Sequence, residues 1–461
     1  MKLYSENKDY KLYNGNMLDL LQVVEENTVD SIVTDPPYEL NFMSKSWDNS
    51  GIAFQKETWE QCYRALKPGG YLLAFGGTRT FHRIACAIED AGFEIRDTIM
   101  WLYGSGFPKS MNIGVAIDKK NGVESKVVGV ARSGKTSRAY QSEEMTTAGE
   151  YVIKQSQNEW NGWGTCLKPS YEPIIVARKP FESSLIDNII EFGVGGMNID
   201  ECRVPLEDNY EFKTTNRQSR QTNNVFDNSN CGFNSENNHT ASADPKGRFP
   251  ANTILTYDET DYEEVCGNFP DSKGASSQNN YSNGHIYRGQ SFNESQTSLN
   301  GFREWYNDDG SASRYFYCAK ASKKDRDEGL DDFEEKKVYG DAFDRGYGNN
   351  NGDNFGDRVA NVTRKNIHPT VKPTELMQYL IKLVTPKNGT ILDPFNGSGS
   401  TGKAVMYENL ERNISYRYIG IELTEEYLPI AKARIEYVCG LPRRDKEKAS
   451  LMDLLGETEE C

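Results

Sequence analysis

The sequence predicts an α/β protein whose single sheet is assembled from both ends of the chain. Strands alternate with helices in the first part, the same alternation returns near the C-terminus, and a stretch rich in Asn, Ser, Asp and Gly separates the two. Such alternation favours parallel strands joined by right-handed crossovers. We therefore expect a split α/β domain over residues 1–180 and 363–440, an insert over residues 181–362 and an acidic tail over residues 441–461.

The first part contains short apolar runs bounded by proline or glycine, which is the pattern of buried strands. The strands predicted there are residues 29–34, 71–75, 93–101 and, after a looser stretch over residues 104–168, residues 171–178. Helical spacing predicts helices over residues 53–66 and 81–91. Each predicted helix ends at glycine or proline. The predicted order is therefore strand, helix, strand, helix, strand, followed by the strand over residues 171–178.

The same alternation returns in the last hundred residues. The elements predicted there are helices over residues 375–383, 401–407 and 426–438 and strands over residues 390–393 and 418–422. Between the two ordered parts, long polar loops are predicted over residues 223–238, 278–300 and 345–357, which are poor in aliphatic side chains. The simplest arrangement is one sheet interrupted by an inserted domain.

Composition excludes several protein classes. There is no run of eighteen apolar residues, so a membrane-spanning helix is not expected, and the N-terminus lacks the pattern of a signal peptide. The nine cysteines are scattered without a C-x-x-C pair, which favours free thiols in the cytoplasm over disulfides or a zinc site. The net charge of −15 argues against a broad non-specific DNA clamp but leaves room for a local basic cleft.

A glycine-rich turn follows the predicted strand over residues 390–393. Glycines let the backbone approach a ligand, and a strand, glycine turn and helix in this order suit nucleotide binding at a doubly wound sheet. The spacing from Gly397 to Lys403 also matches a P-loop, but Ala404 stands where a metal-binding Ser or Thr would follow. Glu422 ends the next predicted strand, where its carboxylate can accept hydrogen bonds from ribose hydroxyls. A glycine turn needed only for packing is the alternative.

The segment Asp35-Pro36-Pro37-Tyr38 follows the first predicted strand. Two prolines stiffen the loop and remove two backbone donors. The Asp35 carboxylate and the Pro36 carbonyl can accept the two hydrogens of an exocyclic amino group, while Tyr38 can stack on the base for roughly 1–3 kcal/mol. The segment therefore predicts an amino-group pocket; an ordinary Pro-Pro turn with a buried tyrosine is the alternative.

Together, Asp35-Pro36-Pro37-Tyr38 and the turn over residues 393–399 resemble the amino-methyltransferases of DNA, which methylate adenine N6 or cytosine N4. The catalytic motif precedes the cofactor motif, an order similar to the beta group of that family. The resemblance implies a Rossmann-like, S-adenosylmethionine-dependent methyltransferase sheet with circularly permuted motifs and a target recognition domain inserted between them.

Further segments carry the same resemblance. Residues 366–373 resemble the other cofactor-binding segment of the group, and residues 15–18 resemble its G-D-x-L segment with Asn16 in place of the usual Asp. Residues 104–110 and 167–173 look like phage and prophage members. These motifs fall in one consistent order, which makes the joint match specific.

The resemblance also implies roles. Asp35, Pro36, Pro37 and Tyr38 would form the catalytic base pocket. The residues implied to bind S-adenosylmethionine are Asn16, His368, Thr370, Lys372, Asp393, Phe395, Gly397, Gly399 and Glu422. Among them, Glu422 would hold the ribose, Lys372 would meet the methionine carboxylate, and Phe395 would lie near the adenine or the methionine. No metal is expected.

The expected reaction is direct methyl transfer to a base flipped out of double-stranded DNA, without a covalent enzyme intermediate. The insert would read base edges and phosphates. Candidate basic residues in it are Arg217, Arg220, Arg288, Arg303, Arg314, Lys320, Lys323 and Lys324. For any one of these side chains, a solvated charged surface is the alternative.

Other functions stay open. Asp at position 35 favours adenine, whereas Ser there would favour the N4 group of cytosine. A protein glutamine methyltransferase would resemble N-P-P-Y with the cofactor motif first, and this chain differs in both respects. An inactive DNA-binding homologue, a homodimer and a separate restriction endonuclease as partner are also open.

Overall fold

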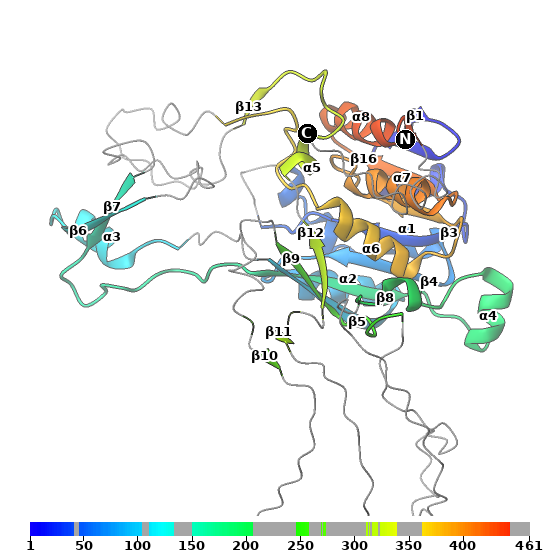
Figure 1. Cartoon of the computed structure of the whole chain (residues 1–461), viewed down its shortest axis with the longest axis horizontal. Helices are drawn as coiled ribbons and strands as arrows, with labels where there is room; N and C mark the ends of the chain where they lie inside the picture. The colour runs from blue at the N-terminus through cyan, green and yellow to red at the C-terminus, as the bar shows by residue number, and fades with distance from the viewer. Residues whose placement is uncertain are drawn as a thin grey trace, which may run out of the picture.

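The computed structural model describes residues 1–40, 46–103, 110–132, 150–205, 246–257, 269, 271–272, 310–311, 313, 316–320, 323–338 and 362–442. Within these ranges the chain forms a layered α/β body from which one small unit projects (Figure 1). None of the described helices is long and apolar enough to cross a membrane.

The body is organised around one ten-stranded sheet. In spatial order its strands are β1 (Lys2–Glu6), β2 (Tyr10–Asn14), β16 (Arg417–Glu422), β15 (Thr390–Asp393), β3 (Val29–Thr34), β4 (Leu66–Phe75), β8 (Tyr171–Arg178), β5 (Glu94–Tyr103), β9 (Thr253–Tyr257) and β12 (Tyr317–Lys320). Strands β15 and β16, from the end of the chain, lie between β2 and β3, from its beginning. The predicted single sheet built from both ends of the chain is confirmed.

Strand directions explain where the ends of the elements meet. From β2 to β4 the neighbouring strands are parallel. Strand β8 is antiparallel to both β4 and β5, and β5, β9 and β12 are parallel to one another. Strand β8 lies between β4 and β5, so these two predicted strands are not direct neighbours. Both strands nevertheless run in the same direction and end at the same edge of the sheet.

Helices cover both faces of this sheet (Figure 1). One face packs against α1 (Lys56–Ala65), α2 (Phe81–Asp90) and the 3-10 helix η1 (Met17–Gln22). The other packs against α6 (Thr374–Val384), α7 (Ser400–Arg412) and α8 (Leu428–Cys439). Along β4, Leu72 and Ala74 belong to the first core and Leu73 and Phe75 to the second. Burial on both faces accounts for the continuous apolar runs seen in the sequence. The arrangement is the doubly wound, Rossmann-like sheet that was predicted.

Smaller elements complete the described chain. They are α3 (Ile113–Lys120), α4 (Leu185–Phe192), α5 (Lys323–Asp327), the pairs β6 (Lys126–Arg132) with β7 (Glu150–Gln155), β10 (Asp271–Ser272) with β11 (Gly310–Ser311) and β13 (Lys336–Val338) with β14 (Val362–Arg364), and the 3-10 helices η3 (Ser46–Asn49), η4 (Ile52–Phe54), η5 (Asp200–Cys202) and η9 (Glu425–Tyr427).

The predicted insert is not wholly separate from the catalytic sheet. Strands β9 and β12, both within residues 181–362, extend that sheet beyond β5. The predicted loops over residues 223–238, 278–300 and 345–357 lie outside the described residues, as do Arg217, Arg220, Arg288, Arg303 and Arg314 and the tail beyond residue 442. Lys320, Lys323 and Lys324 lie in β12 and α5, but their side chains are not among those described. The boundaries at 180 and 362, and a recognition role for the insert, stay predictions.

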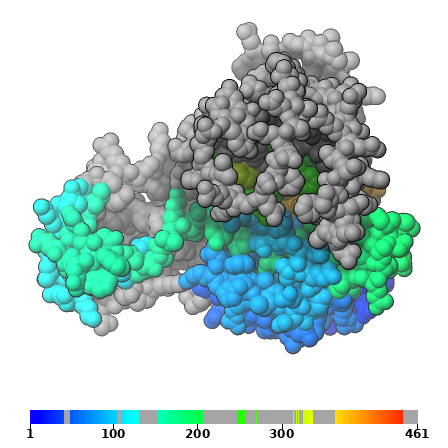
Figure 2. Space-filling view, turned by 90° about the horizontal axis from the view of Figure 1, so that it is seen from below, coloured from blue at the N-terminus to red at the C-terminus, as the bar shows by residue number. Residues whose placement is uncertain are grey.

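The projecting unit consists of α3, β6, β7 and the segment leading to β8. We call residues 110–132 and 150–170 the arm. It stands away from the body in two perpendicular views (Figures 1 and 2). The sequence predicts only loop structure in this region, because its elements are short and lack a clear apolar stripe.

Candidate active site

The two sequence motifs meet at the carboxyl edge of the sheet. Asp35 follows β3, Asp393 ends β15 and Glu422 ends β16, and these three parallel strands are neighbours. The crevice outside the carboxyl ends of such strands is where ligands bind in open α/β sheets. Thr34 Oγ1 donates a hydrogen bond of 2.6 Å to Asp393 Oδ1, so residues 359 positions apart in the chain are in direct contact.

Asp393 ties the catalytic loop to the glycine turn. Its Oδ1 also accepts the Phe395 N–H at 3.1 Å, and its Oδ2 accepts the Thr401 hydroxyl at 2.6 Å. The side chain is only 2% exposed, and this burial raises the pKa of Asp393 to about 6. The carboxylate is thus engaged inside the protein. Asp393 thus positions the loop and the turn relative to each other. Its contact with the cofactor stays a prediction.

The glycine turn has a backbone that requires glycine. Gly397 and Gly399 have φ angles of +52° and +75°, and Gly399 is the N-cap of α7. A Cβ on Gly397 would lie 2.9 Å from His368 Nε2, and one on Gly399 would lie 2.9 Å from Ala431 Cα. Glycine adopts a left-handed φ at little cost, whereas any other residue would suffer both backbone strain and a close contact at these two positions. The turn therefore presents backbone, not side chains, to a ligand.

Glu422 lies beside this turn. Its Oε2 accepts the Gly397 N–H and its Oε1 accepts the Thr424 N–H, both at 2.7 Å. Burial raises the pKa of Glu422 to about 7. Each carboxylate oxygen has a second lone pair beyond the one used by the backbone. Two ribose hydroxyls can therefore be accepted by one side chain, which fits the nucleoside part of S-adenosylmethionine.

His368 covers the turn from the opposite side. Its Nδ1–H donates to the Thr370 carbonyl at 2.7 Å, and its ring meets Tyr427 edge-on at 4.6 Å. This tautomer directs the Nε2 lone pair toward Gly397. Burial lowers the pKa of His368 to about 4, so the imidazole is neutral at physiological pH. Thr370 contributes this carbonyl, and its side chain is exposed.

Two other predicted cofactor residues occupy the rim of the same crevice. Phe395 is half-buried, and its ring lies 6.4 Å from that of Trp59. Asn16 accepts the Leu18 N–H at 3.0 Å and so caps η1, and the preceding Gly15 N–H is bonded to the Glu422 carbonyl. Asn16 thus holds its own segment next to Glu422. Contact of either residue with the cofactor stays a prediction.

Asp35 sits in a pocket of charged and aromatic side chains. Lys372 Nζ donates to Asp35 Oδ2 at 2.6 Å, whereas the buried Oδ1 has no hydrogen-bond partner among the residues that the structure describes. The Lys372 ammonium lies 5.3, 4.9 and 5.9 Å from the ring centres of Tyr38, Phe75 and Trp101. Burial acts to lower the pKa of Lys372, but the carboxylates of Asp35 and Glu172 outweigh it and raise that pKa. The lysine therefore stays charged.

Glu172 completes this pocket, and the sequence assigned it no role. It is the second residue of the antiparallel strand β8. Its Oε2 lies 3.5 Å from Lys372 Nζ and accepts the Tyr38 hydroxyl at 2.7 Å. Tyr103 donates to Oε1 at 3.4 Å. Burial, then the nearby carboxylates, raise the pKa of Tyr38, which keeps it a neutral donor. An acidic residue at the start of an apolar strand is the signal that sequence reasoning passed over. Pro36 is buried and Pro37 half-buried between these groups.

The ammonium of Lys372 lies against Asp35 in this structure. Its contact with the methionine end of the cofactor, which the resemblance implies, stays a prediction. Lys403, which completed the P-loop match, is fully buried and paired with Asp325 at 2.6 Å and Glu328 at 2.7 Å. Its amine is therefore not available to a phosphate. Among the described residues there is no cluster of side chains that could hold a metal ion.

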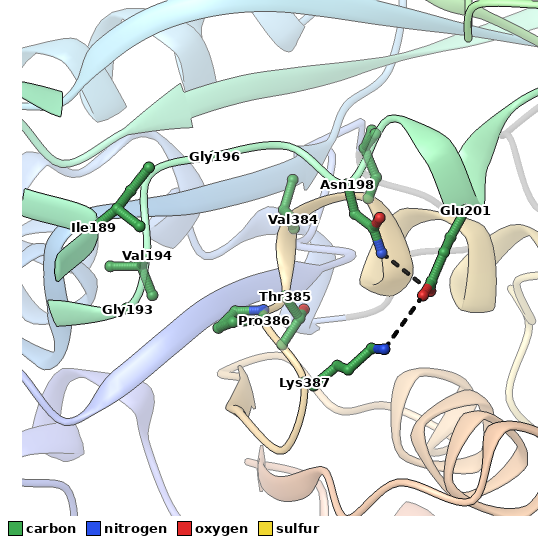
Figure 3. A pocket seen from close by; sticks show the side chains of 11 residues that line it. Ile189, Gly193, Val194, Gly196, Asn198, Glu201, Val384, Thr385, Pro386 and Lys387 are labelled. Atoms are coloured by element: carbon green, nitrogen blue, oxygen red, sulfur yellow. Dashed lines mark hydrogen bonds and ion pairs between the residues drawn. The ribbon is translucent and has the colours of Figure 1, made fainter. Parts of the chain in front are cut away.

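A separate cavity of about 400 Å³ lies at the opposite, amino edge of the sheet (Figure 3). Thr385, Pro386 and Lys387, which precede β15, form one side of it, and Ile189 and Val194 line the other. It lacks the two motifs that meet at the carboxyl edge. The candidate active site is therefore defined by the convergence of side chains around Asp35 and Gly397, not by this cavity.

Comparison with known families agrees with this geometry. A family model described as DNA methylase, of the N6/N4 group, matches residues 29–433. The chain belongs to this family. Family members depend on S-adenosylmethionine, so the predicted family and cofactor are confirmed. The finer likeness to phage members stays a prediction.

Several curated relatives are type II methyltransferases. M.HpaI of Haemophilus parainfluenzae is 35% identical over 108 residues, which are 22% of this chain and 34% of the relative. M.HindIII of Haemophilus influenzae is 21% identical over 231 residues, 41% of this chain and 64% of the relative. M2.DpnII of Streptococcus pneumoniae is 46% identical over 69 residues, 15% of this chain and 24% of the relative. The chain thus matches between about a quarter and two thirds of the length of these relatives.

Solved structures give weaker likenesses. The PvuII DNA methyltransferase, described as cytosine-N4-specific, has a TM-score of 0.40 at 12% identity, with 99% of this chain and 96% of that chain covered. The complex of M1.HpyAVI with S-adenosylmethionine has a TM-score of 0.33 at 14% identity, with 92% and 99% covered.

Proposed function

We propose that this protein is a site-specific DNA methyltransferase that transfers a methyl group from S-adenosylmethionine to the N6 amino group of adenine in double-stranded DNA. The observation that carries the proposal is the buried Oδ1 of Asp35, an acceptor without a partner among the described residues, on a loop tied through Asp393 to the glycine turn. A buried carboxylate oxygen in this state is suited to an incoming N–H donor.

The residues of the base pocket would act on a flipped base, because an amino group inside the duplex cannot reach this crevice. One amino hydrogen would be donated to Asp35 Oδ1 and the other to the Pro36 carbonyl, which draws the nitrogen lone pair out of the ring. The Tyr38 ring would stack on the base, and Glu172 holds that ring by its hydroxyl. Bound S-adenosylmethionine supplies a methyl group already activated by positively charged sulfur, so the protein needs to orient rather than activate it.

Lys372 has a defined part in this arrangement. It occupies Oδ2 of Asp35 and leaves Oδ1 available, so the target amino group would not have to displace it. Its ammonium also lies 3.5 Å from Glu172 Oε2, so one positive charge is shared by the two carboxylates of the pocket. The new N–C bond forms as the S–C bond breaks, and the amino nitrogen then releases one proton toward Asp35 or solvent.

The preference for adenine rests on Asp at position 35. The family includes enzymes of both N6 and N4 types, and cytosine N4 is the second candidate. A restriction endonuclease as a separate partner, a homodimer and a cytoplasmic location belong to the same proposal. Type II methyltransferases among the relatives support the modification of specific DNA sites.

The test combines product analysis with one variant. Duplex DNA is incubated with the protein and tritiated S-adenosylmethionine, and its nucleosides are then separated by mass. We expect N6-methyladenine; N4-methylcytosine would instead support the second candidate, and no methylated base would reject a DNA methyltransferase.

Asp35→Ala is the matched variant. It should lower methyl transfer by about 10²–10⁴-fold, the range typical of a lost acid–base or polarising group. Cofactor affinity, measured by titration, should change by less than about threefold, because Asp35 lies in the base pocket and not at the glycine turn. Retained turnover in this variant would remove Asp35 from the mechanism.

A further inference from the structure

The arm is attached at the wall of the base pocket. It leaves the sheet after Tyr103, at the end of β5, and returns to it at Tyr171, at the start of β8. Strand β5 runs in the same direction as β3 and β4, so both connections lie at the carboxyl edge with Asp35. Tyr103 and Tyr38 donate to the same carboxylate, that of Glu172. The arm thus begins where the target base would enter.

Polar contacts hold the arm together. Its base is closed by a β-bridge between Asn112 and Gly164. At its centre, buried Asp118 accepts the Ser125 hydroxyl and the Asn158 amide, both at 2.8 Å. The described arm residues that are buried are Gly114, Asp118 and Ser156. Its apolar side chains are therefore not used to build an interior.

The apolar side chains of the arm lie on its surface instead. Trp160 and Trp163 form an edge-on pair at 5.2 Å and are 40% and 59% exposed, and Leu167 is 91% exposed. Other exposed apolar residues are Val123, Val127, Val128 and Ile153. Monomeric proteins seldom expose large apolar side chains in such density without a binding role. The described residues of the arm therefore offer an exposed apolar surface suited to a binding partner.

Charge identifies the kind of partner. Residues 110–132 and 150–170 carry six basic and four acidic side chains, one of which is the internally bonded Asp118, in a chain of net charge −15. Lys119 and Lys120 end α3 and Lys126 begins β6, and all three are exposed. A local excess of exposed lysines beside aromatic side chains fits a polyanion, because phosphate contacts scale with the few cations at the surface.

We propose that the arm binds the DNA duplex next to the flipped base, with its lysines on the phosphates and its exposed tryptophans against the sugars or bases. This inference rests on the proposed function. A duplex that delivers a base to Asp35 must lie over the carboxyl edge, and the arm projects from that edge (Figures 1 and 2). The arm would supply affinity, and the recognition insert would supply the sequence.

The test compares two triple variants of the full chain. Lys119→Ala/Lys120→Ala/Lys126→Ala removes three charges from the arm. Lys8→Ala/Lys11→Ala/Lys387→Ala removes three exposed lysines from the amino edge, where the strands begin. Thermal unfolding verifies that both variants are folded, and fluorescence anisotropy with a labelled duplex gives affinity at several salt concentrations.

We expect the arm variant to bind the duplex about tenfold more weakly, with a slope of log affinity against log salt reduced by up to about three, as for three lost phosphate contacts. The control variant should bind like the parent protein. In methylation assays the arm variant should show a raised KM for DNA, with kcat at saturating DNA and the cofactor affinity unchanged.

Other outcomes overturn the proposal. If the parent protein methylates DNA and the arm variant has the same DNA affinity and the same salt slope, DNA binding by the arm is rejected. The proposed function then stays intact. Equal losses in both triple variants reject a specific surface. A change in sedimentation of Trp163→Ala from oligomer to monomer, with unchanged DNA affinity, assigns the arm to a second copy of the chain. A parent protein that neither binds nor methylates DNA rejects the proposed function and the arm together.

Discussion

The proposed base pocket and the glycine turn lie side by side at one edge of the sheet. The first is formed mainly by side chains and the second mainly by backbone. The pocket is made of charged side chains, with the buried Lys372 shared between the half-buried Asp35 and Glu172. The turn presents mainly backbone, and the Glu422 carboxylate beside it already accepts two backbone N–H groups. In the proposed mechanism, side chains therefore act on the target base, and the backbone of the turn shapes the site for S-adenosylmethionine. Substitutions in the two places should separate catalysis from cofactor binding.

The largest effect is expected from Lys372→Met. Without the buried ammonium, the half-buried carboxylates of Asp35 and Glu172 would remain without their common partner. Removing one member of a buried charge cluster typically lowers the free energy of unfolding by about 3 kcal/mol. Methyl transfer should fall by about 100-fold or more, because Asp35 would lose the ion pair that orients its carboxylate. Denaturant titration and steady-state kinetics measure the two effects.

A double variant sharpens this prediction. Lys372→Met/Glu172→Gln removes one of the two carboxylates, so it should recover part of the lost stability. Cofactor affinity should change little in either protein. A Lys372→Met variant whose main defect is weak cofactor binding would assign Lys372 to the methionine end, as the sequence resemblance implied, and would abolish the distinction between pocket and turn.

The glycine turn is tested by Gly397→Ala. A Cβ there combines a φ of +52° with a contact of 2.9 Å to His368 Nε2. Strain of this kind costs on the order of 1–3 kcal/mol, so cofactor affinity should fall about tenfold or more. Turnover at saturating cofactor should be nearly unchanged, which calorimetric titration and kinetics can show.

Gly193→Ala is the matched control. Gly193 has a φ of +73°, but a Cβ there would have no atom within 4 Å. It should therefore lose stability from backbone strain alone and keep its cofactor affinity. Equal losses of affinity in the two variants would show that the close approach at Gly397 is not used by the cofactor.

A smaller effect is expected from pH. The pKa of Glu422 is raised by burial to about 7, and its ionised form is the one that accepts two ribose hydroxyls. Cofactor affinity should therefore decrease as pH falls through that value, by about tenfold between about pH 8 and pH 6. In Glu422→Gln the affinity should be lower and lack this midpoint. A wild-type affinity that is independent of pH would contradict the assignment of Glu422 to the ribose.

Stability gives an independent check on the same residue. The pKa of Glu422 is higher in the folded protein than its ordinary value of 4.5, so the folded state holds the proton more tightly. The free energy of unfolding should then decrease as pH rises from about 4.5 to about 7 on account of this group. Glu422→Gln should lose that contribution, and the titration of Asp393 near pH 6 remains in both proteins.

Local sequence signals predicted most of the fold and both motifs. The predicted strands over residues 171–178 and 390–393 have the observed bounds, because apolar runs ending at proline or glycine are local features. The position of β8 between β4 and β5 could not be predicted in this way, since strand order depends on pairing between distant segments. The residues of the candidate site could be predicted from the sequence where they are consecutive in the chain, as in the segment over residues 35–38 and the turn over residues 393–399.

The contacts that local motifs did not predict are made across the sheet. Glu172 lies in a strand whose sequence is otherwise apolar, and its partners Tyr38 and Lys372 are 134 and 200 residues away in the chain. Lys372 has a long side chain, so its backbone motif does not fix which ligand its ammonium reaches. Such contacts emerge only after the strands are paired.

The bond from Thr34 to Asp393 has a consequence for how the protein is made. A ribosome completes the Asp35 loop early, but the partner that fixes it emerges more than three hundred residues later, and Glu422 later still. The permuted order therefore means that the Asp35 loop and its partners from β15 and β16 come together only after Glu422 has been synthesised.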